Sequence, residues 1–100
     1  MSSITKGEEL LFDTLVDKTA AGKINWKLEG GNSFSFSIKK WKLIVTNSFP
    51  NTLLSLYEED IEQPLTTYIA CSTNLYRLAG LYCEERQKAL EEAIRILKEL

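Results

Sequence analysis

The chain has 100 residues, of which 44% are hydrophobic and 26% charged, and these values are typical of one globular domain. Its formal net charge of −2 provides no positive field for phosphates, so nucleic acid is the least favoured class of partner. No apolar run has the length of a membrane span, and the N-terminal segment lacks the apolar core of a signal peptide. We therefore expect a cytoplasmic protein without a membrane partner.

Residue types that carry catalysis are sparse. The sequence contains no histidine, which removes the commonest general base and a frequent metal ligand. Cys71 and Cys83 do not have the spacing of a metal site, and we expect free thiols unless the fold brings their Cα atoms within about 7 Å. The serines lie outside any G-x-S-x-G motif. From these observations we expect no enzyme, no cofactor and no metal site.

The first predicted element is an amphipathic helix. Thr5 and Glu8 have the spacing of a capping box, which predicts that the helix begins near Lys6. Gly22 is placed to end it in the left-handed conformation. The apolar face of this helix is formed by Leu11, Phe12, Leu15, Val16 and Thr19.

From residue 23 onward apolar and polar residues alternate, which indicates strands with one solvated face. The strands are expected at residues 23–29, 33–38, 41–46, 52–58 and, with weaker alternation, 65–71. Gly-Gly-Asn at residues 30–32 predicts a tight hairpin with positive φ angles, and residues 39–40 form a second short turn. No helix-length segment separates the strands, so we expect an antiparallel meander of four to five strands. Its apolar face would carry Ile24, Trp26, Leu28, Phe34, Phe36, Ile38, Trp41, Leu43 and Val45.

The C-terminal part of the chain is helical in pattern. Ser72, Thr73 or Asn74 can cap its start, and Gly80 weakens its middle. Two apolar stripes follow one another, the first with Leu75, Leu78, Ala79 and Tyr82, the second with Leu90, Ala93, Ile94, Leu97 and Leu100. We expect one bent or broken helical segment over residues 73–99. The pattern is compatible with one helix or with two. The sheet needs cover on its apolar face, so both terminal helical segments are expected to pack on it as a two-layer α+β domain.

Three polar surfaces are candidates for function. Ser33, Ser35 and Ser37 form a small, uncharged strand face that can pack against a partner or a second copy. A second candidate is the acidic loop with Glu58, Glu59 and Asp60, which is expected to be solvated or to bind a basic partner. Lys39, Lys40 and Lys42 surround Trp41 in the manner of a single-strand-binding surface, although a solvated hairpin end is the favoured interpretation.

The layout also resembles a set of small bacterial and phage-associated proteins. These proteins share a leading helix, a G-K-I-x-W strand entry, a meander and a closing helix built on L-Y-x-L-A. The matching residues here are Gly22, Lys23, Ile24, Trp26, Leu75, Tyr76, Leu78 and Ala79. The set has no assigned activity, so the resemblance implies the order of the layers and no functional residue.

The sequence favours a non-enzymatic protein-interaction module of accessory, immunity or antitoxin type, acting through an exposed sheet face or edge on a protein partner or as a homodimer. The alternative is a small-molecule-binding domain, with a pocket between helix and sheet near Trp26, Tyr57 and Tyr68. A pocket of roughly 300 Å³ or more with convergent polar groups would favour this alternative.

Overall fold

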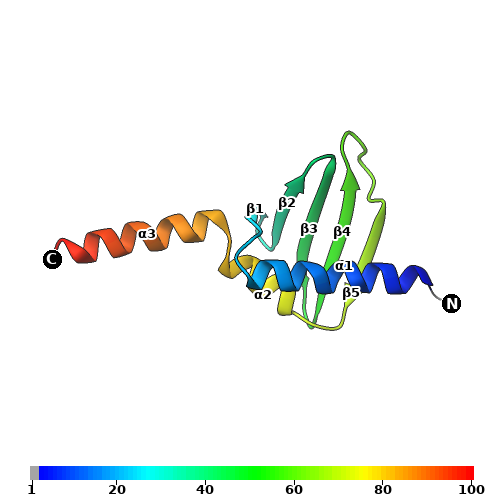
Figure 1. The fold of residues 1–100 in the computed structure, drawn as a ribbon, viewed down its shortest axis with the longest axis horizontal. Coiled ribbons are helices and arrows are strands. Elements are labelled where there is room, and N and C mark those ends of the chain that lie inside the picture. Colours follow the sequence, from blue (N-terminus) through cyan, green and yellow to red (C-terminus); the bar gives the residue numbers. More distant parts are fainter. Residues whose placement is uncertain (1–2) are drawn as a thin grey trace.

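The computed structural model describes residues 3–100, with side chains from Gly7 onward, and has the predicted α+β architecture. Its elements are α1 (Ser3–Ala20), β1 (Lys27–Gly30), β2 (Ser33–Ile38), β3 (Trp41–Ser48), β4 (Asn51–Glu58), β5 (Thr66–Ala70), α2 (Asn74–Leu81) and α3 (Glu84–Lys98). The five strands form one antiparallel meander in the order β1-β2-β3-β4-β5. Figure 1 shows α1 and α2 against one face of this sheet, while α3 extends away from it. The weakly patterned fifth strand is present.

Helix α1 begins earlier and ends where predicted. It starts at Ser3, so the expected start near Lys6 is wrong, and the side chain of Thr5 lies outside the described residues. The Glu8 carboxylate instead accepts a hydrogen bond from the Thr66 hydroxyl of β5. At the other end Gly22 has a φ of 74°, and the Lys23 N–H donates to the Lys18 carbonyl at 3.0 Å, which completes a Schellman cap.

The core lies between the sheet and the pair α1 and α2. Trp26 is fully buried, donates its indole N–H to Thr19 Oγ1 at 3.0 Å and packs on Phe36 at a ring separation of 5.9 Å. The other buried apolar residues are Phe12, Leu15, Ile24, Leu43, Val45, Leu54, Ala70, Leu75, Ala79 and Cys83. The predicted face of α1 is therefore confirmed, and burial of these side chains supplies the main driving force for folding.

Two residues predicted for the core are exposed. Leu28 is 55% exposed and Ile38 is 50% exposed. Leu28 stands opposite Phe34 on the edge strand β1, and Ile38 is the last residue of β2, where the sheet extends past the helices. The strand predicted over residues 23–29 forms only over Lys27–Gly30. The alternation still identifies the side on which Leu28 lies, but two helices cannot cover the whole of that side.

The hairpins are in the predicted places with different backbone geometry. Gly30 pairs with Ser33, and the register shifts between Leu28 and Gly30, so Glu29 forms a bulge. The predicted positive φ angles at residues 30–32 are wrong, since Gly22 is the positive-φ glycine of the described chain. In the second turn Lys39 has a φ of 54°, a conformation that favours glycine or asparagine.

The C-terminal segment consists of two helices with a sharp break. Cys83 separates α2 from α3 with φ −63° and ψ 136°, which is extended geometry. This geometry lets the Glu84 N–H donate to the Trp26 carbonyl at 2.7 Å. At the start of α2 the Ser72 hydroxyl accepts from the Asn74 N–H at 3.1 Å. The break therefore follows from a main-chain contact with the segment before β1, which the sequence pattern does not contain.

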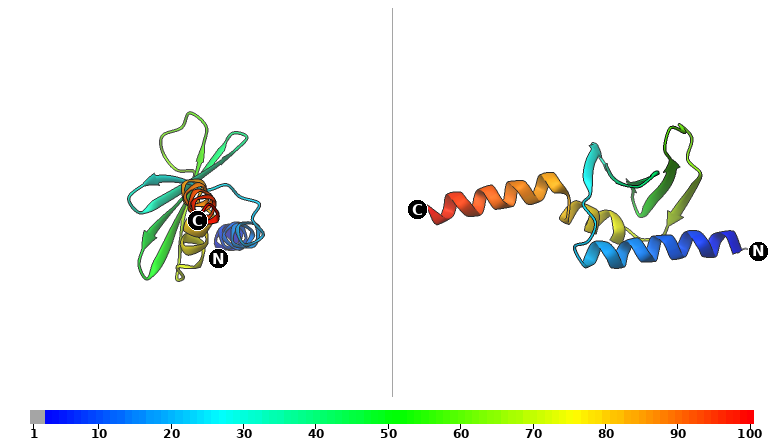
Figure 2. Two further views of the ribbon diagram at one scale, coloured as in Figure 1. Left: turned by 90° about the vertical axis from the view of Figure 1, so that its left-hand side faces the viewer. Right: turned by 45° about the horizontal axis from the view of Figure 1, so that its top comes forward.

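Helix α3 does not cover the sheet, contrary to the prediction. It has no buried residue, and its main contacts are with β1 and α2. The chain measures 60 × 29 × 23 Å along its principal axes, and α3 forms one end of the long axis (Figures 1 and 2). The physical reason is that α1 and α2 occupy the centre of the apolar face, and the extended break at Cys83 directs α3 away from the parts that stay uncovered at Leu28 and Ile38.

Candidate functional site

The serine face of β2 is only partly available as a surface. Ser33 Oγ is hydrogen-bonded to Thr46 Oγ1 at 3.0 Å, and Ser35 is 7% exposed. The prediction of an exposed Ser35 is therefore wrong, because the bulged Glu29 side chain reaches over this part of the sheet and Ser35 donates a hydrogen bond that lowers the pKa of that carboxyl. Ser37 is exposed.

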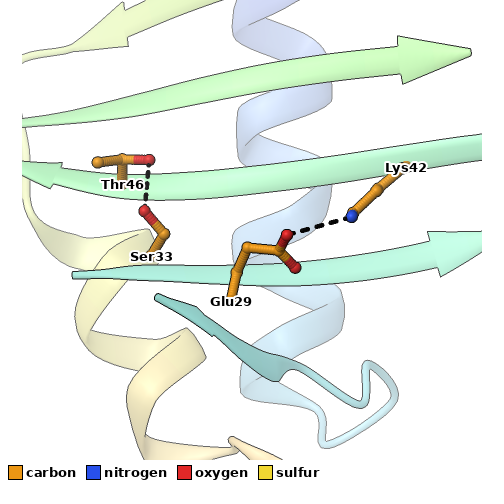
Figure 3. A network of polar contacts seen from close by, with 4 residues as sticks. All are labelled: Glu29, Ser33, Lys42 and Thr46. Carbon is orange, nitrogen blue, oxygen red and sulfur yellow. Dashed lines mark hydrogen bonds and ion pairs between the residues drawn. The ribbon is translucent and has the colours of Figure 1, made fainter. Parts of the chain in front are cut away.

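Polar contacts cross the open face of the sheet. Glu29 Oε2 accepts from Lys42 Nζ at 3.3 Å, and Figure 3 shows this pair beside the Ser33–Thr46 contact, on the side opposite α1 and α2. The four side chains come from β1, β2 and β3. They satisfy one another, so this part of the face needs no partner to satisfy its polar groups.

The structure brings Ser37 together with the predicted acidic loop. Ser37, Glu58, Glu59 and Asp60 all line an open pocket of about 500 Å³ at the end of the sheet. The lysine cluster also lies there: Lys39, Lys40 and Lys42 line the same pocket with Trp41, Ile44, Tyr57 and Ile61.

Two of the three lysines at this pocket are paired with carboxylates of the chain. Lys40 Nζ lies 3.4 Å from Glu58 Oε2 and 5.1 Å from the centroid of the Trp41 ring. Lys42 is held by Glu29 at 3.3 Å. Carboxylates of the same chain therefore neutralise Lys40 and Lys42, which lowers the positive charge that the cluster presents.

The pocket expected between helix and sheet is not formed by the three predicted aromatic residues. Trp26 is 0% exposed, and Tyr68 packs edge-on against Phe12 at 5.8 Å. Tyr57 alternates with the inward residues Leu54 and Leu56, so it lies on the open face of the sheet. The expectation that these aromatics converge is wrong, because the two layers fill the space between them with core side chains.

The two cysteines are free thiols, Cys71 exposed and Cys83 buried. Cys83 Sγ donates to Glu85 Oε1 at 2.9 Å, and burial followed by this hydrogen bond raises the pKa of the thiol. A thiol held in its protonated form is a poor nucleophile. Within residues 3–100, histidine, cysteine and acidic side chains form no group of metal-ligating geometry.

Helix α3 leaves an apolar face exposed. We define the α3 stripe as Leu90, Ala93, Ile94, Leu97 and Leu100. Its large members are 48% exposed at Leu90, 51% at Ile94, 64% at Leu97 and 98% at Leu100. Ile96, beside the stripe, is 52% exposed. Soluble helices normally bury such a stripe, so an uncovered one indicates a binding surface.

The base of α3 is fixed firmly to the domain. Glu85 Oε1 accepts the Leu28 N–H at 3.1 Å as well as the Cys83 thiol, and these contacts lower the pKa of the Glu85 carboxyl. Gln87 Nε2 donates to the Leu81 carbonyl at 2.8 Å. The first turn of α3 is thus anchored while the stripe begins one turn later, so the helix is held out from the body in a defined direction.

The α3 stripe is evident from its spacing in the sequence, but the prediction that it packs on the sheet is wrong. The available signal was the number of apolar faces, since α1 and the first stripe after Ser72 already provide two helices for one sheet. A third apolar helix face is more than the centre of one small sheet can accommodate.

Comparison of the chain with models of protein families, with curated proteins and with solved structures gave no significant match. Separately, none of the helices in residues 3–100 combines the length and the apolar character needed to cross a bilayer.

Proposed function

We propose that this protein is a cytoplasmic, non-enzymatic protein-interaction module of accessory, immunity or antitoxin type, and that the α3 stripe is its main binding surface. The observation that carries the proposal is that α3, a helix of 15 residues, has an apolar face and no buried residue. This revises the expectation of a sheet-face surface, because Ser33 and Ser35 are used within the sheet.

The free energy available at this face is large enough for specific binding. Fully burying a Leu or Ile side chain contributes about 1.5–3 kcal/mol. The unburied area of the four large stripe residues and Ile96 equals about three fully exposed side chains, which corresponds to roughly 5–9 kcal/mol before the costs of association. A partner that covers the stripe can therefore bind with useful affinity.

The charges of α3 favour a protein partner over a lipid surface. The helix carries four Glu residues and four Lys or Arg residues, and no aromatic residue. Helices that lie on membranes have an excess of basic residues on the polar face and aromatic residues at the boundary. An amphipathic helix with balanced charge is instead typical of helix-to-helix or helix-in-groove recognition between proteins.

The test compares two double variants. The stripe variant, Leu90→Gln with Ile94→Gln, makes the apolar face polar without changing the net charge. The matched control, Lys88→Gln with Glu92→Gln, changes the polar face of the same helix and also keeps the net charge. Glutamine is a good helix former, so both variants should keep α3 helical.

The assay is capture from the native cell extract with chemical cross-linking and mass-spectrometric identification of the linked peptides. We expect an identified polypeptide, either another protein or the chain itself, cross-linked near α3 in the wild type and the control and lost in the stripe variant. Identical cross-linking by all three proteins would refute the proposal.

A small-molecule-binding function is the second candidate, and the pocket of about 500 Å³ near Trp41 and Tyr57 is the observation that favours it. A fluorescence screen of organic anions and cations against wild type and Tyr57→Ala tests it, since a ligand there should change Trp41 emission. Saturable quenching of the wild type that Tyr57→Ala abolishes would support a ligand site. If no compound in the screen quenches the wild type saturably, the small-molecule-binding function is excluded.

A further inference from the structure

We infer that the partner of the α3 stripe is the α3 stripe of a second copy of this chain, and that the two helices pair antiparallel. The inference rests on the proposed function and names the occupant of its surface. Three features of the described residues carry it: the heptad order of the apolar residues, the order of charges along one border, and the position of α3 relative to the body.

The apolar residues suit a two-helix pair. Leu90 and Leu97 are one heptad apart, and Ile94 lies between them on the same side of the helix. If Leu90 packs beside Ile94 of the second copy, the two-fold axis passes at the level of residue 92. The same register sets Leu97 beside Gln87 of the second copy. The two-fold axis repeats each of these contacts, so the same residues of both copies are covered in one isologous interface.

The charges along one border of the stripe select the antiparallel direction. Glu84, Glu91 and Lys98 follow one another at intervals of seven residues, so they lie along one line beside the apolar seam. In the antiparallel register the acidic start of this line lies beside the basic end of the second copy's line. Glu84 pairs with Lys98 of the second copy twice, once at each end, and the two helix dipoles oppose one another favourably.

One contact in this arrangement is unfavourable and is therefore diagnostic. Glu91 lies near the two-fold axis, so it faces Glu91 of the second copy. Arg86 lies on the other side of the apolar seam from Glu91. In a parallel pair the two different sides of the seam face one another, so Glu91 would face Arg86 of the second copy. Removing the charge of Glu91 must therefore strengthen an antiparallel dimer and weaken a parallel one.

The position of α3 also excludes a parallel pair. The end-on view in Figure 2 shows α3 within the outline of the body and not at its rim. Packed helices have axes about 8–10 Å apart, whereas the chain measures 29 × 23 Å across its long axis. Two bodies side by side at that spacing would overlap. The antiparallel pair places the bodies at opposite ends of the helices.

The interface has room to extend beyond the helices. In the antiparallel register the end of each α3 reaches the base of the other, where Leu28 and Leu81 are 55% and 48% exposed. Leu28 belongs to this base because its N–H is bound by Glu85. Leu100, the most exposed of these residues at 98%, lies nearest to this region. A helix pair alone is below the size of a standard interface, so we expect a weak dimer.

The experiment measures the mass of the purified full chain by sedimentation equilibrium over a concentration series. We expect a monomer–dimer equilibrium with Kd between about 1 and 100 µM. The stripe variant should raise Kd more than about 100-fold because it removes the apolar contact. The Lys88→Gln, Glu92→Gln control should leave Kd unchanged, and circular dichroism should show equal helix content in all samples.

Charge variants test the direction. Glu84→Lys alone and Lys98→Glu alone should each raise Kd about tenfold, because two attractive pairs become repulsive. The double variant should restore the wild-type Kd, and Glu91→Gln should lower Kd severalfold. Failure of the double variant to recover, or a higher Kd for Glu91→Gln, would overturn the antiparallel pair.

The outcomes separate this inference from the proposed function. A chain that stays monomeric up to about 1 mM, far above the expected range of Kd, overturns self-association and leaves the stripe to a different protein, which the extract experiment tests independently. A dimer that is unchanged in the stripe variant overturns the α3 pair, because its interface would lie elsewhere, and the extract experiment then decides the proposed function by itself.

Discussion

Replacing threonine by valine should change the free energy of unfolding in opposite directions at two buried positions. Thr19 and Thr52 are both 0% exposed. The Thr19 hydroxyl accepts the Trp26 indole N–H at 3.0 Å, whereas Thr52 Oγ1 has no hydrogen-bond partner within the described chain. Valine has nearly the shape of threonine without the hydroxyl, so each substitution reports on that single group.

The magnitudes follow from the cost of burying a polar group without a partner, which is about 1–3 kcal/mol. Thr52→Val removes such a group from β4, and we expect a gain of about 1–2 kcal/mol in the free energy of unfolding. For a domain of this size, each kcal/mol gained raises Tm by roughly 4–8 °C. Thr19→Val should instead lose about 1–3 kcal/mol, because the Trp26 N–H is then buried without an acceptor.

The assay is urea unfolding followed by Trp fluorescence and far-UV circular dichroism, with wild type and both variants under one condition. Equal slopes of free energy against urea would show that the midpoints report stability alone. Destabilisation of Thr52→Val by more than about 0.5 kcal/mol, or stabilisation by Thr19→Val, would refute the assignment of these hydroxyl groups.

Three further predictions concern the core, a turn and the base of α3. Trp26→Ala should lower the free energy of unfolding by about 3–5 kcal/mol, since it empties a fully buried aromatic site; a wild-type-like urea midpoint would place Trp26 outside the core. Lys39→Gly should raise the free energy of unfolding by about 1 kcal/mol, because the φ of 54° strains a residue with a Cβ atom. A lower Tm for this variant would contradict strain at Lys39. Hydrogen bonds lower the pKa values of the Glu29 and Glu85 carboxyls, so their contribution to stability is present above the unfolded-state pKa and is lost as pH falls through the folded-state pKa. Glu85→Gln should therefore reduce the loss of Tm between pH 7 and pH 3, and an unchanged pH profile would show that the Leu28 and Cys83 contacts do not depend on its charge.

Local rules were sufficient for much of the fold. The Gly22 cap, the alternation in β2 to β4 and the positions of the two short hairpins depend on neighbouring residues, and all three were predicted from the sequence. The start of α1 was not, because a capping pair such as Thr5 and Glu8 does not prevent the helix from beginning earlier. Capping preferences are worth about 1 kcal/mol, so other local contacts can override them.

The errors concern residues whose environment is set by distant parts of the chain. The alternation along β1 shows on which side of the strand Leu28 lies, but it does not show that the helices leave Leu28 uncovered. Ser35 became buried because Glu29 bulges over it, which depends on the register between β1 and β2. The break at Cys83 depends on the Trp26 carbonyl. Periodicity identifies the faces of elements, while packing decides which faces are covered.

The candidate site shows the same limit. The α3 stripe was recognised as apolar from its spacing, and the prediction that it packs on the sheet was wrong. An amphipathic pattern has the same form whether the covering surface belongs to the same chain or to another molecule. Only the arrangement of α1 and α2 on the sheet shows that α3 is left uncovered.

The central claim is that the α3 stripe is a binding surface and not part of the core, and one measurement tests it most directly. The free energy of unfolding of the Leu90→Gln, Ile94→Gln variant is compared with that of the wild type at a protein concentration low enough to keep both monomeric. The account predicts a difference within about 0.5 kcal/mol, as for other exposed positions. A loss of several kcal/mol, as expected for Trp26→Ala, would show that the stripe is core and would contradict the account.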